Sequence, residues 1–328
     1  MKRRQSIRRP RGAALLTAML TVALVATFSA AALWQQWRSI EVESAERARV
    51  QSAWVLTGAL DWARLLLRED GRTAGVDHLG EPWAVPLQEA RLSSFLAADR
   101  NNTAETGPDV LEAFLSGQIV DMQSLLNVAR LVQNGKVSEQ DFDSFERLFA
   151  LLGLPEEQLA ALTENLRLAS DPNTNRFSTA PLMAQRTEQL VWLGLTPQTV
   201  TVLRPYVTVL PALNTTVNLN TAAAEVIYAA VPGLSMAEAQ QLVAARERSP
   251  FRTIADASGL LAGGAARMPQ GQAAVGVSSR FFEIRARLRL EQVIVEERTL
   301  VQRDGVDVKV QHRQRGLGEP APVAQVQR

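Results

Sequence analysis

The sequence predicts an α+β fold: one long N-terminal helix packs on an antiparallel sheet, and a large all-helical domain is inserted before the last strands. Three observations support this prediction. An uncharged stretch, Ala13–Trp37, continues into helix-compatible sequence. Residues 128–270 carry repeated helix start and stop signals. Residues 281–303 contain a run in which polar and apolar side chains alternate, which is typical of a half-buried strand.

The composition sets the broad class of protein. With 328 residues, 46% hydrophobic and 21% charged, the chain can bury a sizeable core beside one membrane segment. Cysteine is absent, which excludes a disulfide framework, a zinc-thiolate site and a cysteine nucleophile. Six of the 35 basic residues lie in the first twelve positions, so the remainder of the chain has 29 basic and 34 acidic residues. A mildly acidic body argues against a nucleic-acid-binding protein.

The N-terminal segment predicts a single membrane crossing. As a helix rising about 1.5 Å per residue, Ala13–Trp37 is long enough to cross a hydrocarbon core of about 30 Å. Trp34 and Trp37 lie at its far end, where aromatic rings favour the membrane interface. The Lys/Arg cluster before the segment is expected to stay cytoplasmic, so everything after Arg38 should lie outside the cytoplasm.

Three kinds of processing fit this segment. It could remain as an uncleaved signal anchor, or it could be a secretory signal peptide cut at the small residues Ala30–Ala32. In the third, a short basic leader ends in Gly12 and the cut falls before Ala13, so the apolar helix survives. A leader in this order resembles the type IV prepilin and pseudopilin class, which implies cleavage between Gly12 and Ala13 by a prepilin peptidase, with methylation of the new N-terminus.

The fifth mature position differs from that of ordinary pilins. The resemblance implies a glutamate there, paired with the N-terminal amine of a neighbouring subunit, but this sequence has Thr17. Thr17 has no charge to neutralise a buried amine. In the family this departure characterises the K-type minor pseudopilin, a subunit with nothing stacked ahead of it.

The long helix should continue beyond the membrane. Helix-friendly sequence from Ser39 to Arg68 predicts one helix of about 55 residues and about 80 Å. Residues at near-helical spacing form its expected apolar stripe: Val42, Ala45, Ala53, Trp54, Leu60, Ala63 and Leu67. We expect a loop over Glu69–Gly80, a short extended piece over Trp83–Leu87, and two strands within Ser116–Leu126.

Residues 128–216 look helical. Ser138 is a candidate N-cap and Gly153 a candidate stop, and Pro155 opens a further helix. Two short helices are expected over Thr187–Gly194 and Pro197–Leu203. The phrase EQLVWLGLTPQTVTVLRPY and the earlier Ile119, Asp121, Leu126 and Asn127 resemble patterns of the K-type pseudopilin family, although Gln123-Ser124 departs from its usual residues.

Residues 217–270 contain a helix-hairpin-helix pattern around Pro232–Ser235. Gly233 supplies a tight turn, and Ser235 with Glu238 predicts a capping box. Such hairpins bind DNA through backbone N–H groups assisted by Lys or Arg. This hairpin has neither, and residues 214–264 hold four acids against three bases, which offers little phosphate neutralisation. The charge therefore favours a structural role, and the resemblance to the K-type family implies a SAM-like packing module.

The C-terminal part predicts the main strands. In residues 281–290 apolar side chains alternate with Glu283, Arg285, Arg287 and Arg289, which indicates an antiparallel sheet with one solvated face. An acidic partner for this arginine face is the alternative, and a solvated face is the favoured interpretation. Asp304-Gly305 predicts a hairpin turn.

Motif searches reveal no catalytic site and one weak metal site. There is no nucleophile elbow, P-loop, dinucleotide-binding pattern or histidine pair at metal spacing. Asp171, Asn173 and Asn175 place oxygen ligands at alternating positions, as calcium loops do. Arg176 stands where a glycine is expected, and the distal glutamate is missing, so a plain turn competes with calcium. No other cofactor is expected.

Taken over residues 8–315, the chain resembles the K-type minor pseudopilin (GspK-like) family of type II secretion systems. The resemblance implies a non-enzymatic inner-membrane protein of a Gram-negative bacterium with its C-terminal region in the periplasm. It implies I-type, J-type and H-type minor pseudopilins as partners at a pseudopilus tip, and no nucleic acid. A membrane-anchored DNA-binding protein of the competence type is the alternative, and a type IV pilus minor pilin is a third hypothesis.

The resemblance also implies a division of the chain. Its parts are a prepilin leader (1–12), a transmembrane segment (13–37), the first part of a pilin-like domain (38–127), a first SAM-like helical domain (128–216), a helix-hairpin-helix or second SAM-like module (217–270), the returning strands (271–315) and a disordered tail (316–328).

Overall fold

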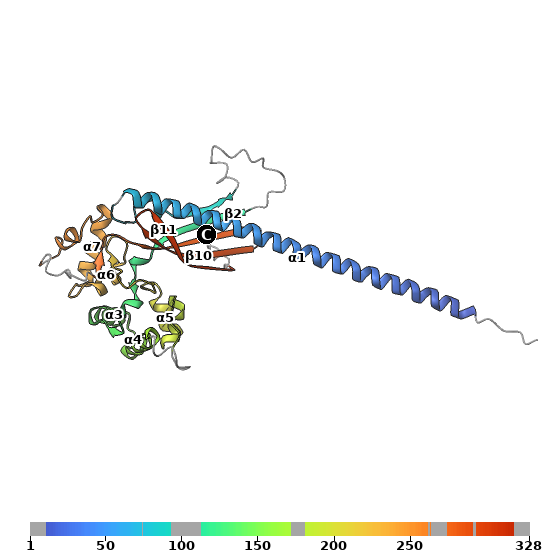
Figure 1. Ribbon diagram of the computed structural model, residues 1–328, viewed down its shortest axis with the longest axis horizontal. Coiled ribbons are helices and arrows are strands. Elements are labelled where there is room, and N and C mark those ends of the chain that lie inside the picture. The colour runs from blue at the N-terminus through green and yellow to red at the C-terminus, as the bar shows by residue number, and fades with distance from the viewer. Residues whose placement is uncertain are drawn as a thin grey trace, which may run out of the picture. The chain divides into compact units, whose positions relative to one another are not determined.

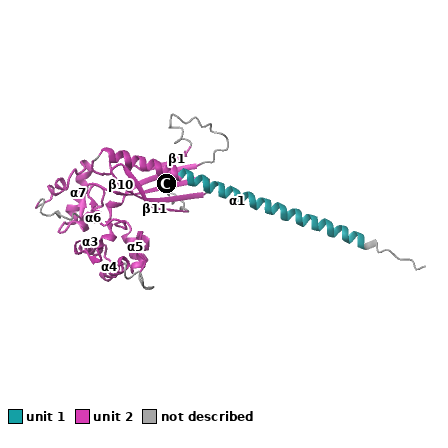
Figure 2. Ribbon diagram, viewed as in Figure 1, with its two compact units in different colours: residues 1–55 teal, residues 56–328 magenta. Residues whose placement is uncertain are grey.

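A computed structural model describes most of the chain. The described residues are 11–73, 75–92, 113–171, 181–261, 263, 274–290 and 293–317. The chain divides into two compact units, residues 1–55 and residues 56–328 (Figure 2).

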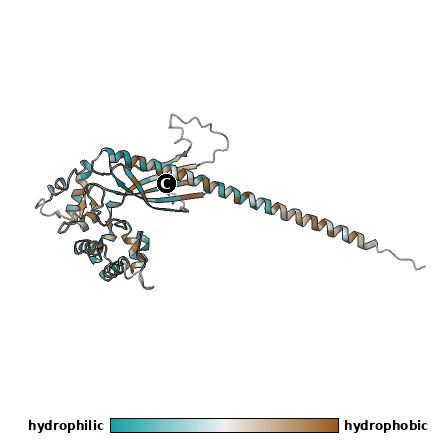
Figure 3. Cartoon of the chain, viewed as in Figure 1, coloured by the Kyte–Doolittle hydropathy of each residue, from teal (hydrophilic) through white to brown (hydrophobic). Residues whose placement is uncertain are grey.

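The first unit is built on helix α1, Arg11–Thr73, whose final third belongs to the second unit. Side chains from Ala13 to Glu46 are exposed, and apolar ones dominate the N-terminal half of the helix (Figure 3). Within the described part of the chain, α1 is the helix that is long and apolar enough to cross a membrane. This agrees with the predicted anchor.

The second unit contains a five-stranded antiparallel sheet (Figure 1). Its strand order is β1-β2-β9-β10-β11. The strands are β1 (Leu87–Arg91), β2 (Ala113–Asp121), β9 (Phe281–Leu290), β10 (Val293–Asp304) and β11 (Asp307–Leu317). Strand β2 pairs with β9, so two neighbouring strands of the sheet are separated in the sequence by the whole helical region. The α+β prediction, with a helical region inserted between strands, is confirmed.

The C-terminal part of α1 covers one face of this sheet. Leu60, Ala63 and Leu67 are buried against it, as the predicted stripe required. Val42 and Trp54 were wrongly included in that stripe and are 57% and 74% exposed. Trp83 packs edge-on against Phe282 with ring centroids 5.1 Å apart. The remaining buried members of this core are Ile119, Ile284, Val301 and Val308.

Helix α1 runs into the region predicted to be a loop, because its last turn is held by contacts that are distant in sequence. A side chain at Gly71 would place its Cβ 2.2 Å from the carbonyl oxygen of Gly305, in the β10–β11 turn. Only glycine allows this close approach of the two backbones. The predicted extended piece over Trp83–Leu87 is also wrong in part, since Pro82–Ala84 forms the short 3-10 helix η1 before β1 begins.

The insertion between β2 and β9 is mainly helical. In chain order it comprises η2 (Met122–Ser124), β3 (Leu126–Asn127), η3 (Val128–Leu131), β4 (Val132–Gln133), β5 (Lys136–Val137), α3 (Glu139–Leu152), α4 (Glu156–Ser170), η5 (Thr187–Leu193), α5 (Pro197–Leu203), β6 (Val207–Thr208), β7 (Val217–Asn218), α6 (Ala224–Ala230), α7 (Met236–Arg248), α8 (Ile254–Ser258) and β8 (Val275–Gly276). Apolar residues of both predicted helical modules contribute to one continuous core.

The capping residues act as the sequence predicts. The Ser138 hydroxyl accepts a hydrogen bond from the backbone N–H of Asp141, and Gly153 ends α3 with φ of 65°. Ser235 and Glu238 form the capping box of α7, and Gly233 has φ of 70° in the preceding turn. These local signals fix where the helices of the insertion begin and end.

The C-terminal hairpin differs from the prediction by one position. Asp304 pairs with Asp307, so the turn consists of Gly305 and Val306. Gly316 and Leu317 were predicted to belong to a disordered tail, but they are part of β11, where they pair with Glu296 and Val295. The rest of that tail, residues 318–328, lies outside the described residues.

Candidate functional site

The predicted processing residues lie at the start of α1. Gly12 and Ala13 are in its first turns, and the preceding residues 1–10 lie outside the described part of the chain. Thr17 is exposed, and its hydroxyl donates to the carbonyl oxygen of Ala14 at 3.0 Å. Its own helix therefore satisfies this hydroxyl without any charged partner. Cleavage between Gly12 and Ala13 stays a prediction.

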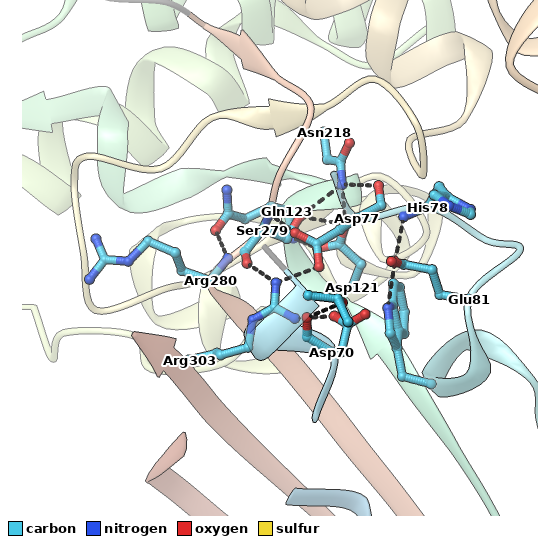
Figure 4. Close-up of polar contacts among 12 residues, drawn as sticks. Asp70, Asp77, His78, Glu81, Asp121, Gln123, Asn218, Ser279, Arg280 and Arg303 are labelled. Atoms are coloured by element: carbon cyan, nitrogen blue, oxygen red, sulfur yellow. Dashed lines mark hydrogen bonds and ion pairs between the residues drawn. The ribbon is translucent and has the colours of Figure 1, made fainter. Parts of the chain in front are cut away.

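A buried polar cluster joins the helical insertion to the sheet core. It forms where the end of α1, the end of β2, the strand β7 and the start of β9 meet (Figure 4). We call it the polar junction, and its members are Asp70, Asp77, Asp121, Asn218, Thr221, Ser279 and Arg303.

Asp121 is the centre of the polar junction. Its carboxylate accepts hydrogen bonds from the Asn218 amide at 3.1 Å, the Thr221 hydroxyl at 2.6 Å and the Ser279 hydroxyl at 2.7 Å. A further bond comes from the backbone N–H of Gln123 at 2.7 Å. One side chain at the end of β2 thus connects the insertion with the segment that enters β9. Because buried polar groups are costly when unpaired, this network favours one arrangement of these segments.

Arg303 of β10 forms the second half of the polar junction. Its guanidinium makes ion pairs with Asp70 and Asp77 and donates to the carbonyl oxygen of Ser279 at 3.0 Å. It also lies 4.8 Å from the ring centroid of Phe282. The Arg303 and Asp77 side chains are 9% and 4% exposed, so this ion pair is largely removed from water. Arg303 therefore connects the end of α1 to the C-terminal end of β10.

Burial perturbs the acids of the polar junction. Loss of solvation raises the pKa of Asp121, against the opposing effect of its hydrogen bonds from Thr221 and Ser279. Burial also raises the pKa of Asp77 and of Asp70, the latter helped by the nearby negative charge of Glu81, while Arg303 lowers both. The ionised forms of Asp70 and Asp77 therefore carry a free-energy cost that Arg303 partly offsets.

Three carboxylates at the edge of the polar junction lie close enough to share a cation. Ligand atoms of Asp70, Asp77 and Glu81 are within 4.8 Å of one another. Arg303 pairs with the first two, and Glu81 accepts hydrogen bonds from the backbone N–H of His78 at 2.9 Å and from the Trp83 indole at 2.8 Å. Since the guanidinium already supplies the positive charge, we assign no metal ion here.

The predicted calcium loop is described only at its first residue. Asp171 directly follows α4 and is partly exposed, and its backbone N–H donates to the carbonyl oxygen of Leu168. Asn173 and Asn175 lie outside the described residues. Calcium binding by these three residues stays a prediction.

The sequence of the helix-hairpin-helix module has no Lys or Arg from Ala222 to Ala245, on either side of its turn. Arg246, one of the three bases counted in this region, points inward and donates to the carbonyl oxygens of Leu219 and Ala222 at 2.6 and 2.5 Å. It therefore stabilises the loop before α6, and its guanidinium is committed to the protein. This arrangement fits a packing module better than a phosphate-binding one.

Sequence reasoning did not identify the polar junction. Its contacts join residues that are far apart in the chain, such as Asp121 with Asn218 and Asp77 with Arg303. On the β2 side, Ile119 and Asp121 nevertheless belong to the residues that resemble the family pattern. The signal that could have found it is the presence of polar residues directly beside apolar strand ends.

Comparison with known proteins agrees with this architecture. The family described as "Type II secretion system (T2SS), protein K" matches residues 124–212 and, in a second part, residues 217–278. The type II secretion system protein K of Pseudomonas aeruginosa is 28% identical over 335 residues, covering 94% of this chain and 93% of that protein.

A solved structure shares the fold. It is the crystal structure of the GspK-GspI-GspJ complex from the enterotoxigenic Escherichia coli type 2 secretion system, with a TM-score of 0.61 and 16% identity. The match covers 84% of this chain and 99% of that chain.

The chain has an apolar N-terminal helix, an antiparallel sheet packed on the C-terminal part of that helix, and a helical insertion between two strands. Together these features define a pilin-like fold. More specifically, the chain is similar to the type II secretion system protein K family, the K-type minor pseudopilins.

Proposed function

We propose that this protein forms the tip of a periplasmic pseudopilus and supports the export of folded proteins across the outer membrane. The observation that carries this proposal is the large helical insertion between β2 and β9, whose helices pack around one continuous apolar core. A subunit this bulky would be hard to accommodate repeatedly along a tightly wound fibre, whereas it fits at the end. The related complex containing GspK, GspI and GspJ supports I-type and J-type partners, and we add an H-type subunit.

The N-terminal segment supplies the anchor in this proposal. The basic leader stays cytoplasmic, α1 crosses the inner membrane once, and the sheet and helical insertion lie in the periplasm. A prepilin peptidase cuts between Gly12 and Ala13. Thr17 brings no carboxylate to the membrane-embedded helix bundle, which suits a subunit with no neighbour ahead of it.

The proposed role is structural and involves no catalysis. The polar junction uses its acids and its arginine to bind one another, and they hold the insertion against the sheet. A DNA-binding role for the helix-hairpin-helix module is not favoured, because Arg246 is turned inward and the hairpin carries no base.

Purification of the tagged full-length chain from its native membranes tests this function. We expect the I-type and J-type pseudopilins to co-purify and the intact mass to begin at Ala13. A matched Gly12→Val variant should keep its leader and lose the partners, because the uncut leader blocks release into the fibre. Co-purification of type IV pilus subunits instead, or a mass beginning at Met1, would contradict the proposal.

A further inference from the structure

A groove runs along the face of the sheet opposite to α1. One side is formed by β9, β10 and β11, and the other by residues 185–188 and 207–209 of the helical insertion. Its volume is about 350 Å³, which is enough for a few side chains of an extended peptide. We call it the arginine groove, for the charged residues described next.

Three guanidinium groups line up across the arginine groove. Arg285 of β9 and Arg298 of β10 are directly paired in the sheet register, and Arg298 is paired on its other side with Gln314 of β11. Arg186 of the insertion donates a hydrogen bond to the side chain of Gln314. Like charges directly opposite one another in a sheet are destabilising. The fold therefore keeps a row of positively charged side chains here without an evident gain in stability.

The carboxylates of the groove are already in use. Glu283 pairs with Arg285, Glu188 pairs with Arg204, and Glu296 lies 3.8 Å from Arg287. Within the described part of the chain, no carboxylate forms an ion pair with Arg186 or Arg298. The uncompensated charge of the groove is thus positive.

The floor of the groove and its rim favour an extended segment. Met122, Leu125 and Leu300 give the floor apolar surface beside the guanidinium groups. On the rim, β11 is the last strand of the sheet among the described residues, so its outer edge offers backbone groups to a neighbour. A chain in strand conformation presents alternate side chains to opposite sides, so one such segment can meet both the floor and the arginines.

We propose that the arginine groove binds an acidic, extended segment of a neighbouring minor pseudopilin, whose carboxylates pair with Arg298 and Arg186. This inference rests on the proposed function, because it assigns the surface through which this subunit is held in the assembly. A carboxylate of the partner segment pairs with Arg298, which lies beside Arg285 in the sheet. Apolar side chains of the same segment contact Leu300.

Binding of the full-length chain in detergent to the purified I-type and J-type pseudopilins tests this surface. The double variant Arg186→Glu/Arg298→Glu should weaken the dissociation constant at least about tenfold, since it places like charges opposite the acidic segment. The matched control Lys136→Glu makes a charge reversal of the same kind on the exposed hairpin residue Lys136 and should change binding by no more than about twofold. Should the double variant unfold, Arg298→Gln replaces it with the same direction of effect.

The outcomes separate this proposal from the proposed function. If the dissociation constants of the groove variants stay within twofold of the wild-type value, the arginine groove proposal is overturned while the tip function stands. Failure of the wild-type chain to bind either partner would contradict the tip function and the groove together. A photo-cross-linking residue at His312, which lines the groove, should capture a partner peptide rich in Asp or Glu, and capture of a peptide without acids would also overturn the proposal.

Discussion

Replacing Arg303 with methionine is expected to destabilise the folded region by about 3–5 kcal/mol, because it leaves buried carboxylates without their cation. Asp77 and Asp70 would then lie beside Glu81 without the guanidinium that pairs with them, and Asp77 would keep its hydrogen bond from the backbone N–H of Ser279. The carbonyl oxygen of Ser279 and the ring of Phe282 would lose their contacts with the guanidinium as well. Thermal and denaturant unfolding of the full-length chain in detergent, followed by tryptophan fluorescence, would measure the loss.

The pH dependence of this variant gives a second readout. Burial already raises the pKa of Asp77, and removal of Arg303 takes away the charge that opposes this effect most strongly. A carboxyl whose pKa is higher in the folded than in the unfolded protein binds its proton more readily when folded, so lowering the pH stabilises the fold. The Arg303→Met variant should therefore regain stability relative to wild type as the pH falls from neutral towards the ordinary range of aspartate.

Arg280→Met provides the matched control. Arg280 is 44% exposed in its ion pair with Asp304 and lies next to Ser279. Such surface pairs contribute about 1 kcal/mol or less, so this variant should remain close to wild type. Equal stability of the Arg303 and Arg280 variants would show that the ion pairs of Arg303 do not hold the end of α1 to the sheet.

Replacing Asp121 with alanine is expected to cost at least about 3 kcal/mol, because several buried donors lose their acceptor at once. The amide of Asn218 and the hydroxyls of Thr221 and Ser279 all converge on this carboxylate. The helical insertion should become easier to digest, since the network joins it to β2 and β9. Limited proteolysis of the full-length chain, read by mass spectrometry, would show cuts on both sides of the insertion.

Asp121→Asn separates charge from shape. The asparagine side chain keeps one acceptor but presents an N–H group to the backbone N–H of Gln123 or to the three side-chain donors. Because burial raises the pKa of Asp121, wild type loses stability as the pH rises through the range between its unfolded and folded pKa, and the variant does not. The deficit of the variant should thus be larger at acid pH than at neutral pH. A deficit that grows with pH would contradict this account of Asp121.

The sequence was informative wherever a structural signal is local. Alternation identified β9, and the caps at Ser138, Gly153 and Ser235 placed helix boundaries correctly. Predictions from the sequence failed where contacts between distant segments determine the structure. The end of α1 extends to Thr73 because Gly71 packs on the turn at Gly305, and no local pattern reports that contact.

The polar junction could not be predicted for the same reason. Asp121 and Arg303 look like ordinary strand residues in the sequence. They form the polar junction with partners that are distant in sequence and come close only in the folded protein. The arginine groove shows the opposite case. The alternating arginines of β9 were interpreted as a solvated face, with an acidic partner as the alternative. The strand register, which places Arg298 beside Arg285, now favours the acidic partner.

The position of the protein on the fibre tests the central claim most directly. Pseudopili assembled in the presence of a chain carrying a small epitope tag can be labelled with gold and viewed by electron microscopy. A tip subunit with a bulky helical insertion predicts label at one end of each fibre. Label spaced along the shaft would contradict the account, because the insertion would then be accommodated within the repeating structure.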